Sequence, residues 1–134
     1  MMANEFVMTD YFAADCGHCQ NFAPVWSQAA ESSHTDATWK SVECYGPGWK
    51  EGQDFSVCKE QNVQSFPTVK LLHYNIDGKV DRTWDFSGPR TAQALEDFAN
   101  QKISDYRGAD LATRCIQGMP FAAIARQSLL SAFL

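Results

Sequence analysis

The sequence lacks the features that would point to a nucleic-acid-binding or membrane-spanning protein. Basic side chains are few, with 11 Lys and Arg against 16 Asp and Glu and a net charge of -5. This deficit argues against nucleic acid or an anionic membrane as the main partner. No apolar run reaches the roughly 20 residues that a membrane span requires, since the most apolar segment, residues 119–134, contains Arg126.

A secretory signal, internal repeats and low-complexity tracts are also missing. Residues 1–5 are polar, and the apolar run after them has neither the length nor the flanks of a signal peptide. We therefore expect that the sequence is either a mature chain or one shortened at its front.

The composition is that of one folded domain. Apolar residues make up 45% of the 134 residues and charged residues 20%, which is typical of a globular protein with a real core. We predict a domain over residues 1–103 and a helical C-terminal extension over 104–134. Within the extension, Pro120 near a first turn favours a short packing helix at 119–134.

Hydrophobic periodicity predicts alternating strands and helices, and hence an α/β fold. Strands are expected at about 5–12, 39–44, 68–74 and 80–86, and helices at 17–33, 54–61 and from Thr91 onward. A hairpin turn at Asp77-Gly78 would join the last two strands. This order requires a mixed sheet with helices on both faces. Pro24 is expected to kink the first helix without ending it.

Two of the five cysteines lie close together, in Asp15-Cys16-Gly17-His18-Cys19. Their spacing allows a disulfide to open and close, which is redox chemistry. Between a strand and a helix, Cys16 would face the free N–H groups and the positive dipole end of the helix, which lower a thiol pKa. A protonated His18 imidazole would lower it further. We predict that Cys16 attacks and that the more buried Cys19 resolves.

A structural zinc site is the alternative interpretation. Cys16 and Cys19 have the spacing of half a zinc knuckle, and Cys44 and Cys58 could supply two more thiolates. Because Cys44 and Cys58 do not form a second close pair, redox chemistry without a metal or an organic cofactor is favoured. The number of cysteines favours an oxidising compartment. His34 and His73 show no ligand pattern, and Trp49 and Trp84 are expected to be packing residues.

The chain resembles the thioredoxin superfamily, and within it the protein disulfide isomerase and quiescin sulfhydryl oxidase branch. The likeness covers roughly residues 6–101, and the Gly17-His18 dipeptide is typical of the isomerases. It rests on three segments in the family's order: Tyr11-Phe12-Ala13-Ala14-Asp15-Cys16-Gly17-His18-Cys19-Gln20-Asn21-Phe22-Ala23-Pro24, Ser65-Phe66-Pro67-Thr68-Val69-Lys70, and Phe86-Ser87-Gly88-Pro89-Arg90-Thr91. The resemblance implies a thioredoxin fold, a central mixed β-sheet flanked by helices, shortened here at the N-terminus.

The resemblance also assigns roles in substrate binding and proton transfer. Phe66 and Pro67 match the loop of the family's cis-proline, which offers backbone groups to a substrate strand; without the family, Pro67 is a proline at a strand start. Asp10 matches a buried acid that moves the proton of the resolving thiol, and the alternative is an edge-strand carboxylate in water. Ser41 takes the place of the lysine that usually pairs with this acid, so water would assist, and Lys40 should point to the opposite face.

Two further residues flank the expected dithiol. Arg90 resembles the arginine that swings toward the active site and lowers the pKa of the resolving thiol, although a solvated surface arginine is equally consistent. Asp15 occupies the position at which the family has tryptophan. The resemblance places this residue beside the Cys16 sulfur, facing the substrate. Its charge opposes the Cys16 thiolate, so we expect a higher Cys16 pKa and a weaker oxidant than a typical isomerase domain.

The remaining cysteines have structural interpretations. Cys44 and Cys58 fall where the quiescin branch carries a second disulfide, which would add about 3 kcal/mol in the chain-entropy model; two buried thiols are the alternative. Cys115 has no evident partner and is expected to be a buried free thiol, with an intermolecular disulfide as the alternative.

We therefore predict a thiol–disulfide oxidoreductase of the protein disulfide isomerase type. Its partners would be protein thiols and disulfides and a recycling partner, namely an oxidase, glutathione or a reductase. The predicted location is the lumen of the endoplasmic reticulum or another secretory compartment. Two alternatives remain: a cytosolic thioredoxin-like reductant, and a thioredoxin-fold binding module with little redox activity.

Overall fold

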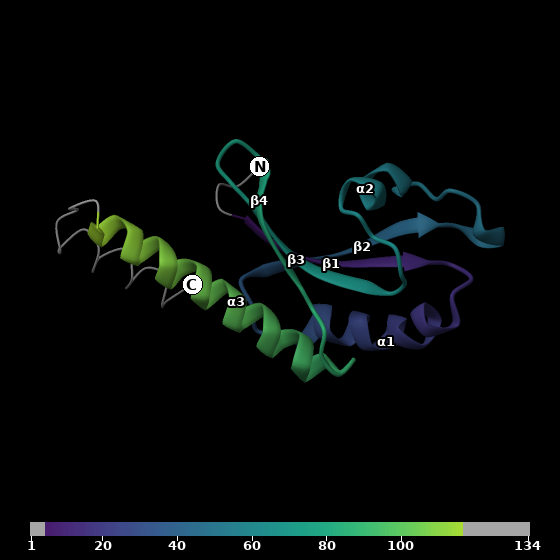
Figure 1. Ribbon diagram of the computed structural model, residues 1–134. Coiled ribbons are helices and arrows are strands. Elements are labelled where there is room, and N and C mark those ends of the chain that lie inside the picture. Colours follow the sequence, from purple (N-terminus) through teal and green to yellow (C-terminus); the bar gives the residue numbers. More distant parts are fainter. Residues whose placement is uncertain (1–4, 117–134) are drawn as a thin grey trace.

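The computed structural model describes residues 5–116 (Figure 1). The predicted packing helix at 119–134 and the thiol of Cys115 lie outside what is described. The elements follow in the order β1 (Glu5–Ala13), α1 (Gly17–Ser32), β2 (Ala37–Tyr45), the 3₁₀ turn η1 (Pro47–Trp49), α2 (Phe55–Glu60), β3 (Thr68–Tyr74), β4 (Val80–Asp85) and α3 (Ala92–Ile116).

The sheet is mixed, which confirms the predicted architecture. Its strand order is β2-β1-β3-β4. β1 runs parallel to β2 and antiparallel to β3, and β3 pairs antiparallel with β4. No strand precedes β1 within residues 5–116. α1 continues through Pro24 without a break, so that proline does not end the helix.

Two apolar clusters cover the two faces of the sheet, and Figure 1 shows α2 above the sheet and α1 below it. The larger cluster joins β1 and β3 to α1 and α3 through Phe6, Met8, Phe22, Trp26, Ala29, Val69, Leu71, Leu95, Ala99 and Ile103. The smaller one joins β1 and β2 to α2 through Tyr11, Val42, Cys44 and Cys58. Alternate β1 side chains thus enter opposite clusters, which explains why this strand reads as a nearly continuous apolar run.

Helix α3 extends past the predicted domain boundary, since residues 103 and 104 both lie within its 25 residues. The second half of α3 contacts residues that lie far from it in the sequence. The Tyr106 ring lies 4.2 Å from the His73 ring and 5.6 Å from the Phe6 ring. Arg107 Nη1 donates to Asp36 Oδ2 at 2.8 Å. Sequence periodicity did not show these contacts. No helix within the described part of the chain is long and apolar enough to cross a bilayer.

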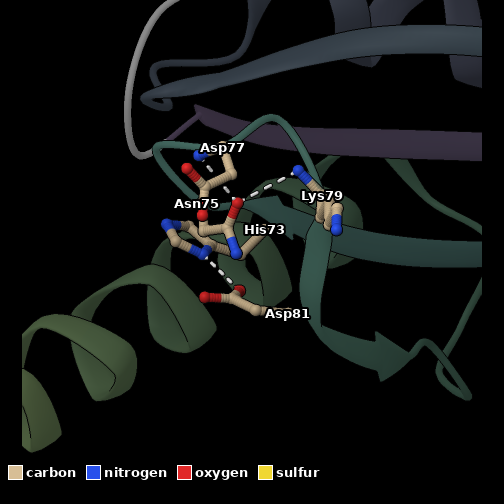
Figure 2. A network of polar contacts seen from close by, with 5 residues as sticks. All are labelled: His73, Asn75, Asp77, Lys79 and Asp81. Carbon is tan, nitrogen blue, oxygen red and sulfur yellow. Dashed lines mark hydrogen bonds and ion pairs between the residues drawn. The ribbon is translucent and has the colours of Figure 1, made fainter.

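The predicted turn between β3 and β4 is built around Asn75 (Figure 2). Its side-chain oxygen accepts hydrogen bonds from the backbone N–H groups of Asp77 and Lys79, each at 3.0 Å. Gly78 has a φ of 77°, which glycine adopts without strain. Asn75 and Gly78 together therefore fix the register of this hairpin.

A buried polar pair lies beside the turn. His73 is fully buried on β3, and its Nδ1 is 2.6 Å from Asp81 Oδ1 on β4 (Figure 2). His73 Nε2 has no hydrogen-bond partner among the described residues. The Asp81 carboxylate is thus the polar contact that offsets the burial of this imidazole.

We expect Asp81→Ala to lower the free energy of unfolding by about 1–3 kcal/mol, because it leaves a buried ring nitrogen without its partner. Urea titration followed by circular dichroism measures the change. Asp105→Ala, at an exposed position of α3, is the control and should change stability far less. Equal stabilities for the two variants would contradict this role of Asp81.

Candidate functional site

The dithiol lies where β1 leads into α1. Cys16 is the residue at which α1 begins, with extended backbone angles and its carbonyl accepting from the N–H of Gln20 at 3.0 Å. The turn before it is held by the N–H of Ala14, which donates to the carbonyl of Tyr45 at 2.8 Å. The central strand and the neighbouring strand β2 therefore both position the first sulfur.

Cys16 is half-buried, and its thiol lies 3.7 Å from the carbonyl oxygen of Phe66 as a hydrogen-bond donor. Burial raises the pKa of this thiol, but four other effects together lower the pKa below its ordinary value: hydrogen bonds from the Cys19 backbone, the Cys19 thiol and the His18 backbone, and the Arg90 charge. The start of a helix thus acts as predicted. His18 acts through its backbone N–H, and its side chain is exposed; the role of its imidazole stays a prediction.

Cys19 has the opposite character. It is buried, with 6% of its surface exposed, and burial raises its pKa well above the ordinary value. The Ala13 backbone opposes this shift, whereas the Cys16 thiol and the charges of Cys16 and Asp10 add to it. Both cysteines are free thiols. Cys16 is therefore the thiol that ionises first.

Asp10 lies in β1 with 5% of its surface exposed. Burial raises the pKa of its carboxyl group to about 7, and the Arg90 charge lowers it. Because β1 is a central strand, the alternative of an edge-strand carboxylate in water is wrong. Asp10 Oδ1 has no hydrogen-bond partner among the described residues, and its register partner on β2 is Ser41.

The loop before β3 lies against the dithiol. The Phe66-Pro67 peptide bond is cis, and the Phe66 carbonyl is the group that contacts Cys16. Arg90 is an exposed residue just before α3, and its charge reaches both Cys16 and Asp10. Loop residues far apart in sequence therefore surround the first sulfur.

Asp15 makes a contact that the sequence did not predict. Its Oδ2 accepts a hydrogen bond from the Gly48 backbone N–H at 2.6 Å, which links the dithiol turn to η1. Gly48 and Trp49 both have positive φ values, of 76° and 59°. Trp49 was expected to be packed, but 52% of its surface is exposed. The effect of the Asp15 charge on Cys16 stays a prediction.

Cys44 and Cys58 form a disulfide between β2 and α2. Because these two sulfurs are bonded to each other, they are not available to complete a zinc site with Cys16 and Cys19. The disulfide forms part of the wall of a cavity of about 280 Å³. Local sequence patterns do not indicate this cavity, since its walls come from three separate segments.

Comparisons with known proteins agree with the geometry. The family model described as thioredoxin matches residues 1–101. The chain is 33% identical over 99 residues to a protein disulfide-isomerase of Saccharomyces cerevisiae. The aligned region covers 73% of this chain and 17% of that protein. It is 30% identical over 101 residues to protein disulfide-isomerase like 2-2 of Arabidopsis thaliana, covering 75% and 20%. The chain thus spans about a fifth of the length of these relatives.

Solved structures give the same result for the fold. The J-Trx1 fragment of ERdj5 superposes with a TM-score of 0.60 at 22% identity, over 74% of this chain and 42% of that one. The first two thioredoxin domains of Naumovozyma dairenensis Eps1p give a TM-score of 0.56 at 28% identity, over 73% and 35%.

We expect Arg90→Met to raise the pKa of the Cys16 thiol, because the variant removes a positive charge that stabilises the thiolate. The pH dependence of Cys16 alkylation by iodoacetamide, measured in a Cys19→Ala background, reports this pKa. Arg82→Met, on β4, is the matched control and should leave the profile in place. Superimposable profiles for the two variants would show that Arg90 does not act on the sulfur.

Proposed function

Because the chain belongs to the thioredoxin family, we propose that it is a thiol–disulfide oxidoreductase of the protein disulfide isomerase kind. It exchanges disulfides with protein substrates through Cys16 and Cys19. The observation that carries the proposal is the opposite shift of the two thiol pKa values, lowered at Cys16 and raised at Cys19. Since the thiolate is the nucleophile, Cys16 is equipped to attack while Cys19 stays protonated until it is needed.

The exchange proceeds through a mixed disulfide. In the reductive direction, the Cys16 thiolate attacks one sulfur of a substrate disulfide; a new S–S bond forms, the old one breaks, and the second substrate sulfur leaves as a thiolate that takes a proton from water. Cys19 then loses its proton, attacks the Cys16 sulfur and expels the remaining substrate thiolate. The substrate gains two electrons, and the Cys16–Cys19 pair becomes a disulfide. The reverse steps oxidise a substrate dithiol.

Asp10 is the group suited to take the Cys19 proton. Its charge acts on the Cys19 thiol, and its pKa of about 7 lets it accept or release a proton near neutral pH. Ser41 is its register partner in place of a basic residue, so water would carry the proton between the carboxylate and solvent. Arg90, whose charge also reaches Asp10, would favour the ionised carboxylate.

The substrate polypeptide would lie against the Phe66-Pro67 loop. The Phe66 carbonyl already contacts the Cys16 thiol. An extended segment bound through backbone hydrogen bonds would bring its cysteine to this sulfur. Asp15, directly before Cys16, has its carboxylate bound to the backbone N–H of Gly48.

We place this function in an oxidising compartment such as the lumen of the endoplasmic reticulum. The support is the Cys44–Cys58 disulfide, since structural disulfides persist in oxidising compartments and are rare in the cytosol. The dithiol would be recycled there by an oxidase or by glutathione disulfide.

We expect Asp10→Asn to slow the resolving step by about 10–100-fold at pH 8, because the proton acceptor is lost. In the native protein this rate should rise as pH passes through about 7, where the Asp10 carboxyl ionises. The measurement is stopped-flow release of thionitrobenzoate from Cys16 by Cys19. An Asp10→Asn profile that keeps the inflection near pH 7 would rule the role out, and Asp105→Asn serves as the exposed control.

Equilibration in graded glutathione buffers, with alkylation and mass spectrometry, tests the proposed function as a whole. We expect a Cys16–Cys19 midpoint closer to the roughly -180 mV of disulfide isomerase than to the potential of a thioredoxin, but somewhat more negative than the isomerase value because of the Asp15 charge, with Cys44–Cys58 closed throughout. A midpoint near about -270 mV would indicate a thioredoxin-like reductant instead. Turnover of a protein disulfide should vanish in Cys16→Ser, and a native dithiol that does not exchange at all would leave only a binding module.

A further inference from the structure

Four aromatic rings gather beside the dithiol around Tyr45, and we call them the aromatic cluster: Tyr45, Trp49, Phe55 and Phe66. The Tyr45 ring lies 6.0 Å from that of Trp49, 5.5 Å from that of Phe55 and 5.7 Å from that of Phe66. None of the four is fully buried, and Trp49 is 52% exposed. The cluster is thus an apolar surface that the fold leaves open to solvent.

The cavity of about 280 Å³ opens at this cluster. It is lined by Cys44, Tyr45, Phe55, Cys58, Lys59, Asn62, Val63, Gln64 and Phe66. Its volume is at the lower end of the range of ligand pockets, about 300–1,000 Å³, and is sufficient for one large side chain. Three aromatic residues, a valine and the disulfide form most of its walls, Lys59, Asn62 and Gln64 form the rest, and no carboxylate is among them. A single uncharged apolar side chain is the occupant that this size and chemistry favour.

Phe66 connects the cavity to the reacting sulfur. Its side chain belongs to the cavity lining, while its carbonyl oxygen is 3.7 Å from Cys16 Sγ. A substrate cysteine bonded to Cys16 would therefore lie next to a residue that also lines the cavity. In an extended chain, side chains two positions apart point the same way and are about 7 Å apart. A side chain near the substrate cysteine can thus reach the cavity.

Two hydrogen bonds hold the cluster in place relative to the dithiol. Asp15 Oδ2 accepts from the Gly48 N–H at 2.6 Å, immediately before Trp49. The Ala14 N–H donates to the Tyr45 carbonyl at 2.8 Å. The two residues before Cys16 are thus bound to the segment that carries Tyr45 and Trp49, which makes Asp15 a positioning residue for the aromatic cluster.

We propose that this cavity is a side-chain pocket that selects polypeptide substrates carrying an aromatic or large aliphatic residue within two positions of the exchanging cysteine. The inference rests on the proposed function and deepens it, because it states which protein substrates the dithiol prefers. The continuity of the pocket with the exchange site through Phe66 carries it.

Two peptide probes test the preference. Each holds one cysteine as a mixed disulfide with thionitrobenzoate, and they differ only in carrying Phe or Ala two positions to either side of that cysteine. The second-order rate constant with the reduced protein is followed by thionitrobenzoate release and divided by the rate with free glutathione, which removes differences in intrinsic reactivity. Burial of a large part of one aromatic side chain predicts about a tenfold preference for the Phe probe.

Filling the pocket should abolish the preference. Val63→Phe places a ring in the cavity, and Gln64→Trp covers the cavity from an exposed position of its lining. The ratio of the rate constants for the Phe and Ala probes should fall to about one in both variants. Val57→Phe makes the same substitution as the first variant at an exposed α2 position outside the lining, and it should keep the ratio. Circular dichroism and thermal unfolding check that each variant is folded.

The outcomes separate this inference from the proposed function. Equal normalised rates for the Phe and Ala probes with the native protein, or a ratio that survives both pocket-filling variants, would overturn the pocket and leave the oxidoreductase in place. Rates no higher than those of Cys16→Ser with either probe would overturn both.

Discussion

Strand β1 is buried on both faces at once, and the arrangement of the candidate site follows from this constraint. It lies between β2 and β3, with Met8 in the cluster under α1 and α3 and Tyr11 in the cluster under α2. A strand anchored in this way delivers Cys16 to a fixed point at its carboxyl end. It also carries Asp10 into the same apolar surroundings, where burial raises its pKa to about 7. The burial of β1 thus accounts both for its core packing and for the raised pKa of Asp10.

The thiols of Cys16 and Cys19 differ in pKa because the two residues lie three positions apart at the start of a helix. Cys16 occupies the helix start, where backbone N–H groups face its sulfur and solvent is near, so its thiolate is favoured. Cys19 lies one turn further along, against the core, where an ionised sulfur is penalised by burial and by two neighbouring anions. A single turn of helix therefore separates a thiol whose pKa is lowered from one whose pKa is raised.

The sequence alone predicted what depends on local pattern and short motifs. The strands, the helices, the mixed sheet and the position of Cys16 between a strand and a helix followed from periodicity and from the spacing in the dithiol motif. The length of α3 did not, because Tyr106 contacts Phe6 on β1 and His73 on β3, and Arg107 binds Asp36 just before β2. The partner of Asp15 was missed for the same reason, since the path of the loop that brings Gly48 to it depends on tertiary structure. The cavity likewise has walls from separate segments.

The Cys44–Cys58 disulfide encloses the turn that carries Trp49 and an exposed lysine, Lys50. Exposed loop tips of this kind are where proteases cut first. A chain cut after Lys50 would remain one covalent molecule, running as intact protein on a non-reducing gel and separating into two fragments only after reduction. The disulfide would still join β2 to α2 at the base of the loop. A sequence change or even a break at the loop tip therefore need not separate these two elements.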